Sequence, residues 1–252
     1  MPGRFQNLMK SPRILALCVF ALSSPLTFAQ IGFPTYVPMK IDQTVEAVYP
    51  RRLVAVGLKS GAASIAIAVD DDGQLTDYLV TAYSHPAFAE SAVQAVKKWK
   101  FEPARVHGAP RKSKSDITFR FEIEGVVVVT LTPLTYGELV HFKISPDSEA
   151  YSACTLAQLD RIHNPTRIVN PVYPNQLARS SLGGRIHVEF YIDQTGRVRM
   201  PSVSRETDEA SEELSSAAIT AVAQWQFDPP TVKGRPVLVL AQQDFNFKPA
   251  SP

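Results

Sequence analysis

The residues that most often carry chemistry are spread along this chain without the spacing that a reactive site needs. The histidines do not pair at metal-ligand spacing with one another or with a cysteine. They are His85, His107, His141, His163 and His187. The sequence has no glycine-rich phosphate loop, nucleophile elbow or zinc motif. We therefore predict that the protein is not an enzyme and that it needs neither a metal nor another cofactor.

Two charged runs and the two tryptophans have simple structural interpretations. The acidic residues 70–72 lack the loop length and the later bidentate glutamate of a calcium loop, so we predict a turn. The basic run at residues 105–114 favours a solvated loop, with contact to anionic lipid or lipopolysaccharide as the alternative. Trp99 and Trp225 stand at helical spacing from apolar residues, which indicates core positions rather than ligand-stacking ones.

The first 29 residues have the pattern of a secretory signal. Arg4, Lys10 and Arg13 precede an apolar stretch, and Thr27-Phe28-Ala29 resembles a cleavage site. We expect cleavage near Ala29 and export to the periplasm. The alternative is an uncleaved anchor in the inner membrane, with the rest of the chain facing the periplasm.

The part of the chain after the predicted signal has almost equal numbers of basic and acidic side chains, and it contains one cysteine. Without residues 1–29 the chain has 23 basic and 24 acidic side chains, which does not suggest a nucleic-acid partner. Cys18 lies within the predicted signal, so Cys154 is left without a partner for an internal disulfide. We interpret Cys154 as a buried apolar thiol.

The rest of the chain repeats one set of motifs in the same order. Tyr49-Pro50 returns as Tyr173-Pro174, at an offset of 124 residues. Trp99-Lys100-Phe101-Glu102-Pro103 returns as Trp225-Gln226-Phe227-Asp228-Pro229, at an offset of 126. Both tryptophans of the chain therefore occupy one position of the repeat. Such order predicts two copies of one supersecondary unit.

Periodicity assigns the same four elements to each copy: a helix opened by Tyr-Pro, a β-hairpin around an Asp/Gly turn, a second helix and a last strand. In the first hairpin strand of copy one, Ile65, Ile67 and Val69 alternate with Ser64, Ala66 and Ala68. This alternation predicts one buried face. The last strands are expected at residues 117–123 and 237–247. Between the copies, we expect an ordered connector in which residues 126–131 extend the last strand, with a strand at 139–144 and a helix at 152–161.

This order of motifs resembles the C-terminal domain family of TonB, an energy transducer. The resemblance implies an α+β fold with two TonB C-terminal-like modules, each a three-stranded antiparallel sheet with two helices on one face. The expected divisions are a signal peptide at 1–29, an irregular segment at 30–45, domain 1 at 46–125, a connector at 126–168 and domain 2 at 169–248.

The resemblance also implies a binding mode, in which an extended segment of an outer-membrane TonB-dependent receptor, or of another envelope protein, adds as a strand to an open sheet edge. In the family this edge is the last strand, and a glutamine before Tyr-Pro lies near the receptor. Asn170 fills the glutamine position in copy two and Glu46 fills it in copy one, which favours copy two. The implied binding residues are Asn170, Val237, Val239, Ala241, Gln243, Phe245 and Phe247.

The chain departs from the family energiser in its N-terminal part. The apolar segment looks cleavable, and no long Pro-rich spacer follows it. Inner-membrane proton-channel partners are therefore expected only if the signal stays uncleaved. The alternative function is a structural or assembly protein, whose modules pair through their sheet edges within one chain or in a homodimer, without transducing energy.

Overall fold

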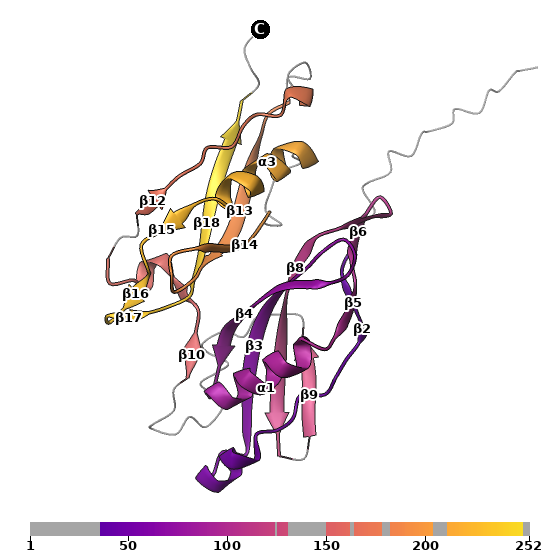
Figure 1. The fold of residues 1–252 in the computed structure, drawn as a ribbon, viewed down its shortest axis with the longest axis vertical. Coiled ribbons are helices and arrows are strands. Elements are labelled where there is room, and N and C mark those ends of the chain that lie inside the picture. Colours follow the sequence, from indigo (N-terminus) through magenta and orange to yellow (C-terminus); the bar gives the residue numbers. More distant parts are fainter. Residues whose placement is uncertain are drawn as a thin grey trace, which may run out of the picture. The chain divides into compact units, whose positions relative to one another are not determined.

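The computed structural model describes residues 36–123, 125–130, 150–161, 164–177, 182–203 and 211–248. Pro34–Pro252 forms one compact unit, and it contains two modules of similar architecture (Figure 1). We name residues 36–130 module 1 and residues 164–248 module 2. The predicted signal peptide and the expected strand at 139–144 lie outside the described residues. Within the described residues, no helix is long and apolar enough to cross a membrane.

Module 1 is built on a long central strand with a helix across one face. Its elements are β1 (Tyr36–Val37), β2 (Lys40–Gln43), η1 (Arg51–Val56), β3 (Ser60–Val69), β4 (Leu75–Tyr83), α1 (Pro86–Val96), β5 (Lys100–Glu102), β6 (Ala104–Val106), β7 (Ala109–Arg111), β8 (Ser113–Glu122) and β9 (Gly125–Thr130). The main sheet has the order β10-β4-β3-β8-β9, in which β10 (Tyr151–Ser152) comes from the connector. Short pairings, β1-β6-β7 and β2-β5, complete the module.

Module 2 repeats this plan with a four-stranded sheet. The elements from the connector onward are β11 (Cys154–Thr155), η2 (Leu156–Gln158), β12 (Pro165–Arg167), η3 (Asn175–Leu177), β13 (Gly184–Ile192), β14 (Val198–Val203), α3 (Glu212–Val222), β15 (Gln226–Phe227), β16 (Thr231–Val232), β17 (Arg235–Pro236) and β18 (Val239–Phe247). The sheet order is β11-β18-β13-β14, and short pairings join β12 to β15 and β16 to β17.

The structure confirms the α+β class but corrects the details of each module. The sheets have five and four strands instead of three, because connector strands and β9 are added to the three antiparallel strands that the periodicity predicted. The element opened by Tyr-Pro is a 3-10 helix, η1 or η3, so each module has one α-helix among the described residues. The expected helix at 152–161 is also wrong, since this segment forms β11 and η2.

The helices begin where side chains satisfy their free N–H groups. His85 Nδ1 accepts a hydrogen bond from the Ala87 N–H at the start of α1, at 3.1 Å. Ser211 Oγ accepts one from the Leu214 N–H at the start of α3, at 3.3 Å. Each helix then covers one face of its sheet (Figure 1) and contributes to a separate apolar core. Trp99 and Trp225 are 5% and 8% exposed, which confirms their predicted core positions.

The predicted turns are confirmed by their backbone geometry. Asp70 Oδ1 accepts hydrogen bonds from the N–H groups of Asp72 and Gln74, as an Asx turn requires. Gly73 and Gly196 have φ values of 81° and 82°. A Cβ on Gly196 would lie 1.9 Å from the Phe227 carbonyl oxygen. Both the left-handed backbone and the close contact therefore exclude other residues at this position.

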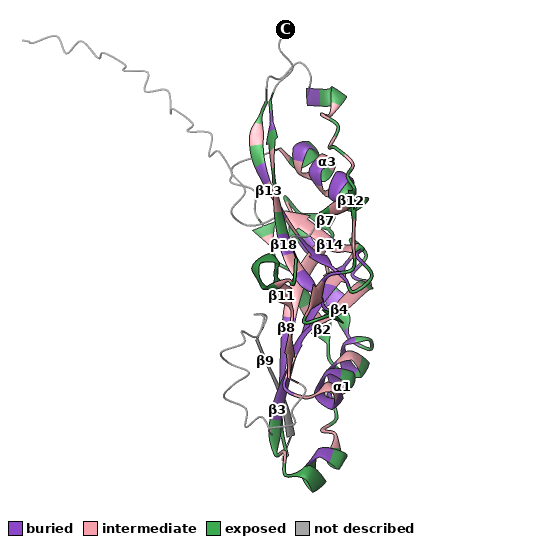
Figure 2. Cartoon of the chain, turned by 90° about the vertical axis from the view of Figure 1, so that its left-hand side faces the viewer, coloured by how far each residue is buried: buried purple, intermediate pink, exposed green. Residues whose placement is uncertain are grey.

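The strand β3 is buried on both faces, not on one as its alternation predicted (Figure 2). Ile65 and Ile67 point into the core beneath α1. On the other face, Ala66 belongs to a second apolar cluster that contains Tyr191 and Leu238 of module 2. The small side chains of Ala66 and Ala68 on this face thus belong to an interface between modules, because short side chains let a second sheet approach closely.

Candidate partner-binding site

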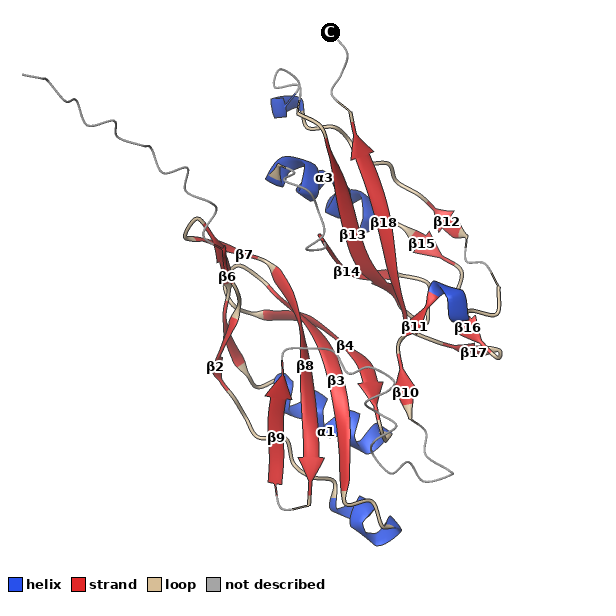
Figure 3. Ribbon diagram, turned by 180° about the vertical axis from the view of Figure 1, so that it is seen from behind, coloured by secondary structure: helices blue, strands red, loops and turns tan. Residues whose placement is uncertain are grey.

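The last strand of module 1 is not an open edge. The chain reverses after β8, and β9 runs antiparallel beside it, from Glu122 opposite Gly125 to Thr118 opposite Thr130 (Figure 3). The strand β8 therefore lies between β3 and β9. This finding overturns two expectations: residues 117–123 are not a free gripping edge, and residues 126–131 do not extend the last strand. The valine-rich segment has apolar residues throughout, so its pattern did not distinguish extension from reversal.

The last strand of module 2 is open over only part of its length. On one side β18 pairs with β13 throughout, from Val239 opposite Ile192 to Phe247 opposite Gly184. On the other side β11 runs parallel to it and pairs with Val239 and Leu240 alone. Among the described residues, no strand pairs with residues 241–247 on that side. The predicted edge at 237–247 is therefore wrong for its N-terminal part.

Hydrogen bonds to the connector show which residues of β18 direct their backbone groups outward. The Cys154 N–H donates to the Leu238 carbonyl at 2.8 Å. Because backbone groups alternate between the two sides of a strand, the even-numbered residues face the same way as Leu238. Gln242, Asp244 and Asn246 thus present their N–H and C=O groups to the open side. The Asp244 carbonyl on this side accepts a local hydrogen bond from Gln243 Nε2 at 2.9 Å.

The odd-numbered residues predicted for binding instead build the module. The side chains of Val237, Val239, Ala241 and Phe247 are buried in the core, and those of Gln243 and Phe245 are half-buried. From Val239 onward their backbone groups face β13, whereas the Val237 N–H donates to the Pro230 carbonyl at 3.0 Å. Sequence analysis missed the even-numbered residues because it selected the apolar set, although the same alternation would have indicated the polar residues between them.

Asn170 lies outside β18, which contains five of the other six predicted residues. Its neighbour Val169 is held by Trp225, whose Nε1–H donates to the Val169 carbonyl at 2.8 Å. Trp99 makes the equivalent bond to the Val45 carbonyl, also at 2.8 Å. Asn170 is exposed and lines a groove beside α3. The repeated tryptophan therefore anchors the segment before Tyr-Pro in each module.

The tyrosine of Tyr-Pro has an equally clear structural role. The Tyr49 hydroxyl donates to the Leu58 carbonyl, and the Tyr173 hydroxyl donates to the Leu182 carbonyl, each at 2.6 Å. Leu58 and Leu182 are separated by the same offset as the two tyrosines. These paired bonds show that the two segments are held in the same way.

A short strap, residues 151–155, joins the two sheets. Its first part pairs with β4, where Tyr151 is opposite Tyr83, and its second part pairs with β18. The Leu238 N–H donates to the Tyr151 hydroxyl at 3.0 Å. Burial of that phenol, partly offset by this hydrogen bond, raises the pKa of Tyr151 to about 12. Cys154 within the strap is half-buried rather than buried, and its burial raises the pKa of its thiol.

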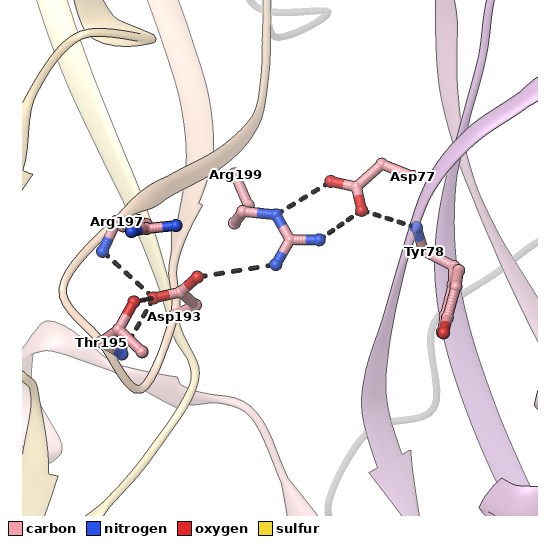
Figure 4. A network of polar contacts seen from close by, with 6 residues as sticks. All are labelled: Asp77, Tyr78, Asp193, Thr195, Arg197 and Arg199. Carbon is pink, nitrogen blue, oxygen red and sulfur yellow. Dashed lines mark hydrogen bonds and ion pairs between the residues drawn. The ribbon is translucent and has the colours of Figure 1, made fainter.

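Charged groups also connect the modules. Arg199 on β14 donates two hydrogen bonds to the Asp77 carboxylate on β4, and its third nitrogen lies 3.5 Å from Asp193 (Figure 4). Lys114 pairs with Glu189 at 2.6 Å. Burial opposes ionisation of Asp193, but hydrogen bonds from Thr195 and Arg197 and the charge on Arg199 outweigh it and lower the pKa of Asp193.

Two related α+β modules are fastened by a strap, and within the described residues part of β18 has no partner strand on the side away from β13. The sequence matches the family of Gram-negative bacterial TonB protein C-terminal domains at residues 45–123 and 169–249. The chain belongs to this family, and it contains two copies of the domain. The family consists of energy transducers and protein-interaction domains, not enzymes, in agreement with the predicted absence of catalysis.

Two individual relatives can be compared with this chain. It is 32% identical over 89 residues to Protein TonB of Vibrio cholerae serotype O1, a match that covers 35% of this chain and 36% of that protein. The chain thus matches only about a third of the length of this relative. The solution NMR structure of the Pseudomonas aeruginosa TonB C-terminal domain is 28% identical, covers 37% of this chain and 92% of that one, and has a TM-score of 0.30.

Proposed function

We propose that this TonB-related protein captures an extended segment of an outer-membrane receptor, or of another envelope protein, by strand addition to module 2. The observation that carries the proposal is that, among the described residues, no strand pairs with residues 241–247 of β18 on the side away from β13. An open edge of this kind is a template for an incoming strand, because each added residue can complete backbone hydrogen bonds. Gln242, Asp244 and Asn246 supply those groups.

Module 1 has a different role in this proposal. Its equivalent edge, that of β8, is already occupied by β9 over Thr118 to Glu122, so we assign the binding edge to β18 of module 2. Module 1 supports module 2 through the strap and the contacts around Arg199 and Ala66. In this proposal the partner segment binds at β18.

A proline at an outward-facing position tests the proposal directly. An edge strand tolerates proline where the backbone N–H that proline lacks would face solvent. Gln242→Pro therefore removes one outward-facing donor and leaves the pairing with β13 in place. Gln242→Ala is the matched control, because it keeps the N–H. The assay is fluorescence anisotropy with labelled peptides from the periplasmic N-termini of TonB-dependent receptors.

We expect wild type and Gln242→Ala to bind with similar affinity and Gln242→Pro to bind at least about tenfold more weakly, the equivalent of about 1.4 kcal/mol. Circular dichroism must show that the proline variant stays folded. Equal binding by all three proteins, or binding by none, would rule out capture at this edge. A proline at Val239 is unsuitable for this test, because Val239 pairs with Ile192.

The same open edge supports a second candidate, which is assembly of this chain with a copy of itself. In the described residues no strand of module 1 pairs with a strand of module 2, so edge pairing would occur between chains. Analytical ultracentrifugation over a range of concentrations separates the candidates. A dimer that Gln242→Pro converts to monomer favours assembly, whereas a monomer at all concentrations removes it.

We also propose that the protein is periplasmic and released from its signal near Ala29. The support is the charged, apolar and small-residue pattern of residues 1–29. N-terminal sequencing of the protein from cells tests this. A start at Gln30 supports a binding protein without its own membrane anchor, whereas a retained Met1 supports an anchored transducer with inner-membrane partners.

A further inference from the structure

In both modules the same tyrosine and tryptophan hydrogen bonds hold the segment around Tyr-Pro. The modules differ in the contacts between this segment and the α-helix. In module 1 the Ser91 hydroxyl on α1 donates to the Val48 carbonyl at 2.5 Å. Beside it, Arg52 pairs with Glu90 of α1 at 2.9 Å. These two contacts bridge the space between the segment and the helix.

Both bridges are missing from the equivalent place in module 2, as the repeat offsets show. Ala217 stands where module 1 has Ser91, and it has no hydroxyl to donate. Gln176 and Ser216 replace Arg52 and Glu90, so no ion pair can form. A groove of about 790 Å³ lies there instead, between residues 169–176 and α3.

The described residues that line this groove are rich in hydrogen-bond acceptors, and none of them is a lysine, arginine or histidine. Its walls include Val172, which is 79% exposed, and the amides of Asn170 and Gln176. Glu212 and Glu213 lie at the N-terminal end of α3 and also line it. A ligand that fits must bring positive charge, hydrogen-bond donors and some apolar surface.

Module 1 already places one cation at this end of the groove. Arg111 on β7 pairs with Glu212 at 2.6 Å, which shows that a guanidinium can dock here. Glu213 is exposed and remains as the second carboxylate. The Val172 carbonyl corresponds to the Val48 carbonyl that Ser91 binds in module 1, so it can accept a hydrogen bond from a ligand.

We propose that this groove binds an extended basic segment of a partner protein. A lysine or arginine of that segment pairs with Glu213, its aliphatic stem lies along Val172, and its main chain donates to the Val172 carbonyl. This surface is separate from the open edge of β18, so the proposal stands or falls independently of strand addition.

The test restores the bridges of module 1 in module 2. The variant Gln176→Arg, Ser216→Glu, Ala217→Ser should close the groove, and Glu213→Gln should remove the free carboxylate. The probes are a short fluorescein-labelled peptide of alternating lysine and valine, and a matched peptide with glutamate in place of lysine. Binding is measured at low salt and again at higher salt.

We expect the lysine peptide to bind wild type, the glutamate peptide not to bind, and salt to weaken the complex. The closed variant should bind at least about tenfold more weakly and Glu213→Gln severalfold more weakly, while Gln242→Pro leaves this affinity unchanged. Unfolding midpoints check that each variant is folded.

Three outcomes would overturn the proposal: no binding of the lysine peptide, unchanged binding by the folded closed variant, or loss of binding in Gln242→Pro. The last result would place the peptide on the strand edge. Receptor peptides that bind wild type but not Gln242→Pro would support strand addition whatever the lysine peptide does, so the two proposals fail separately.

Discussion

Replacing Arg199 by methionine should weaken both modules at once, because this side chain links them. Arg199 is 33% exposed, and its partners Asp77 and Asp193 are 27% and 11% exposed. Breaking a fully buried ion pair costs about 3–5 kcal/mol, and an exposed pair contributes about 0–1 kcal/mol. An intermediate burial, with two carboxylates left facing each other, gives a loss of about 2 kcal/mol in the free energy of unfolding.

The chain carries its own reporters for this experiment, since Trp99 is in the core of module 1 and Trp225 is in the core of module 2. Urea unfolding of Arg199→Met is followed by fluorescence in Trp99→Phe and Trp225→Phe backgrounds, so that each module is observed alone. With a slope near 2 kcal/mol per M, both midpoints should fall by about 1 M.

Arg197→Met is the matched control, because Arg197 is an exposed arginine on the same chain segment and forms no ion pair with the described residues of module 1. It should leave both midpoints within about 0.2 M of the values for the parent Trp99→Phe and Trp225→Phe proteins. The reasoning is refuted if Arg199→Met behaves like this control. A fall confined to the Trp225 reporter would show that the pair stabilises module 2 without coupling it to module 1.

Three further changes test other parts of the structure. Gly196→Ala should lower the free energy of unfolding by more than about 2 kcal/mol, because its φ is 82° and a Cβ would meet the Phe227 carbonyl; chemical denaturation checks this. Trp225→Phe should lose about 1–2 kcal/mol with the bond to the Val169 carbonyl, as the same assay measures. Burial, opposed by the charge of Lys114, raises the pKa of Asp116. Ionisation of Asp116 therefore lowers the stability of the fold above the unfolded-state pKa of about 4. Asp116→Asn should unfold at a higher temperature than wild type at pH 7, and this difference should shrink as the pH approaches 4.

Sequence periodicity predicted the parts of the fold that depend on local chain geometry. The turn at Gly196, the helix α3 and the core position of Trp225 all follow from residue type and spacing, and the structure confirms them. The Tyr-Pro helix was predicted too long, because the apolar spacing of a few residues does not separate a 3-10 helix from an α-helix.

The open edge was harder to predict because it depends on which distant segments return to the sheet. The strand β9 follows β8 directly and reverses onto it, while β11 comes from the connector and covers only Val239 and Leu240. The sequences of β8 and β18 contain no pattern that indicates which strand pairs with them. The register of non-local strands is set by the packing of the whole module.

The sequence by itself determined that this chain contains two copies of one TonB C-terminal-like module, because repeated motifs, turn residues and apolar spacing are local properties. Only the tertiary structure decided how the copies differ. It pairs β8 of module 1 with β9, leaves residues 241–247 of β18 without a described partner strand on the side away from β13, and buries Ala66 against Tyr191. The physical reason is that a strand edge or a sheet face is free or covered according to which segment folds against it. The residues of the strand itself do not specify that segment.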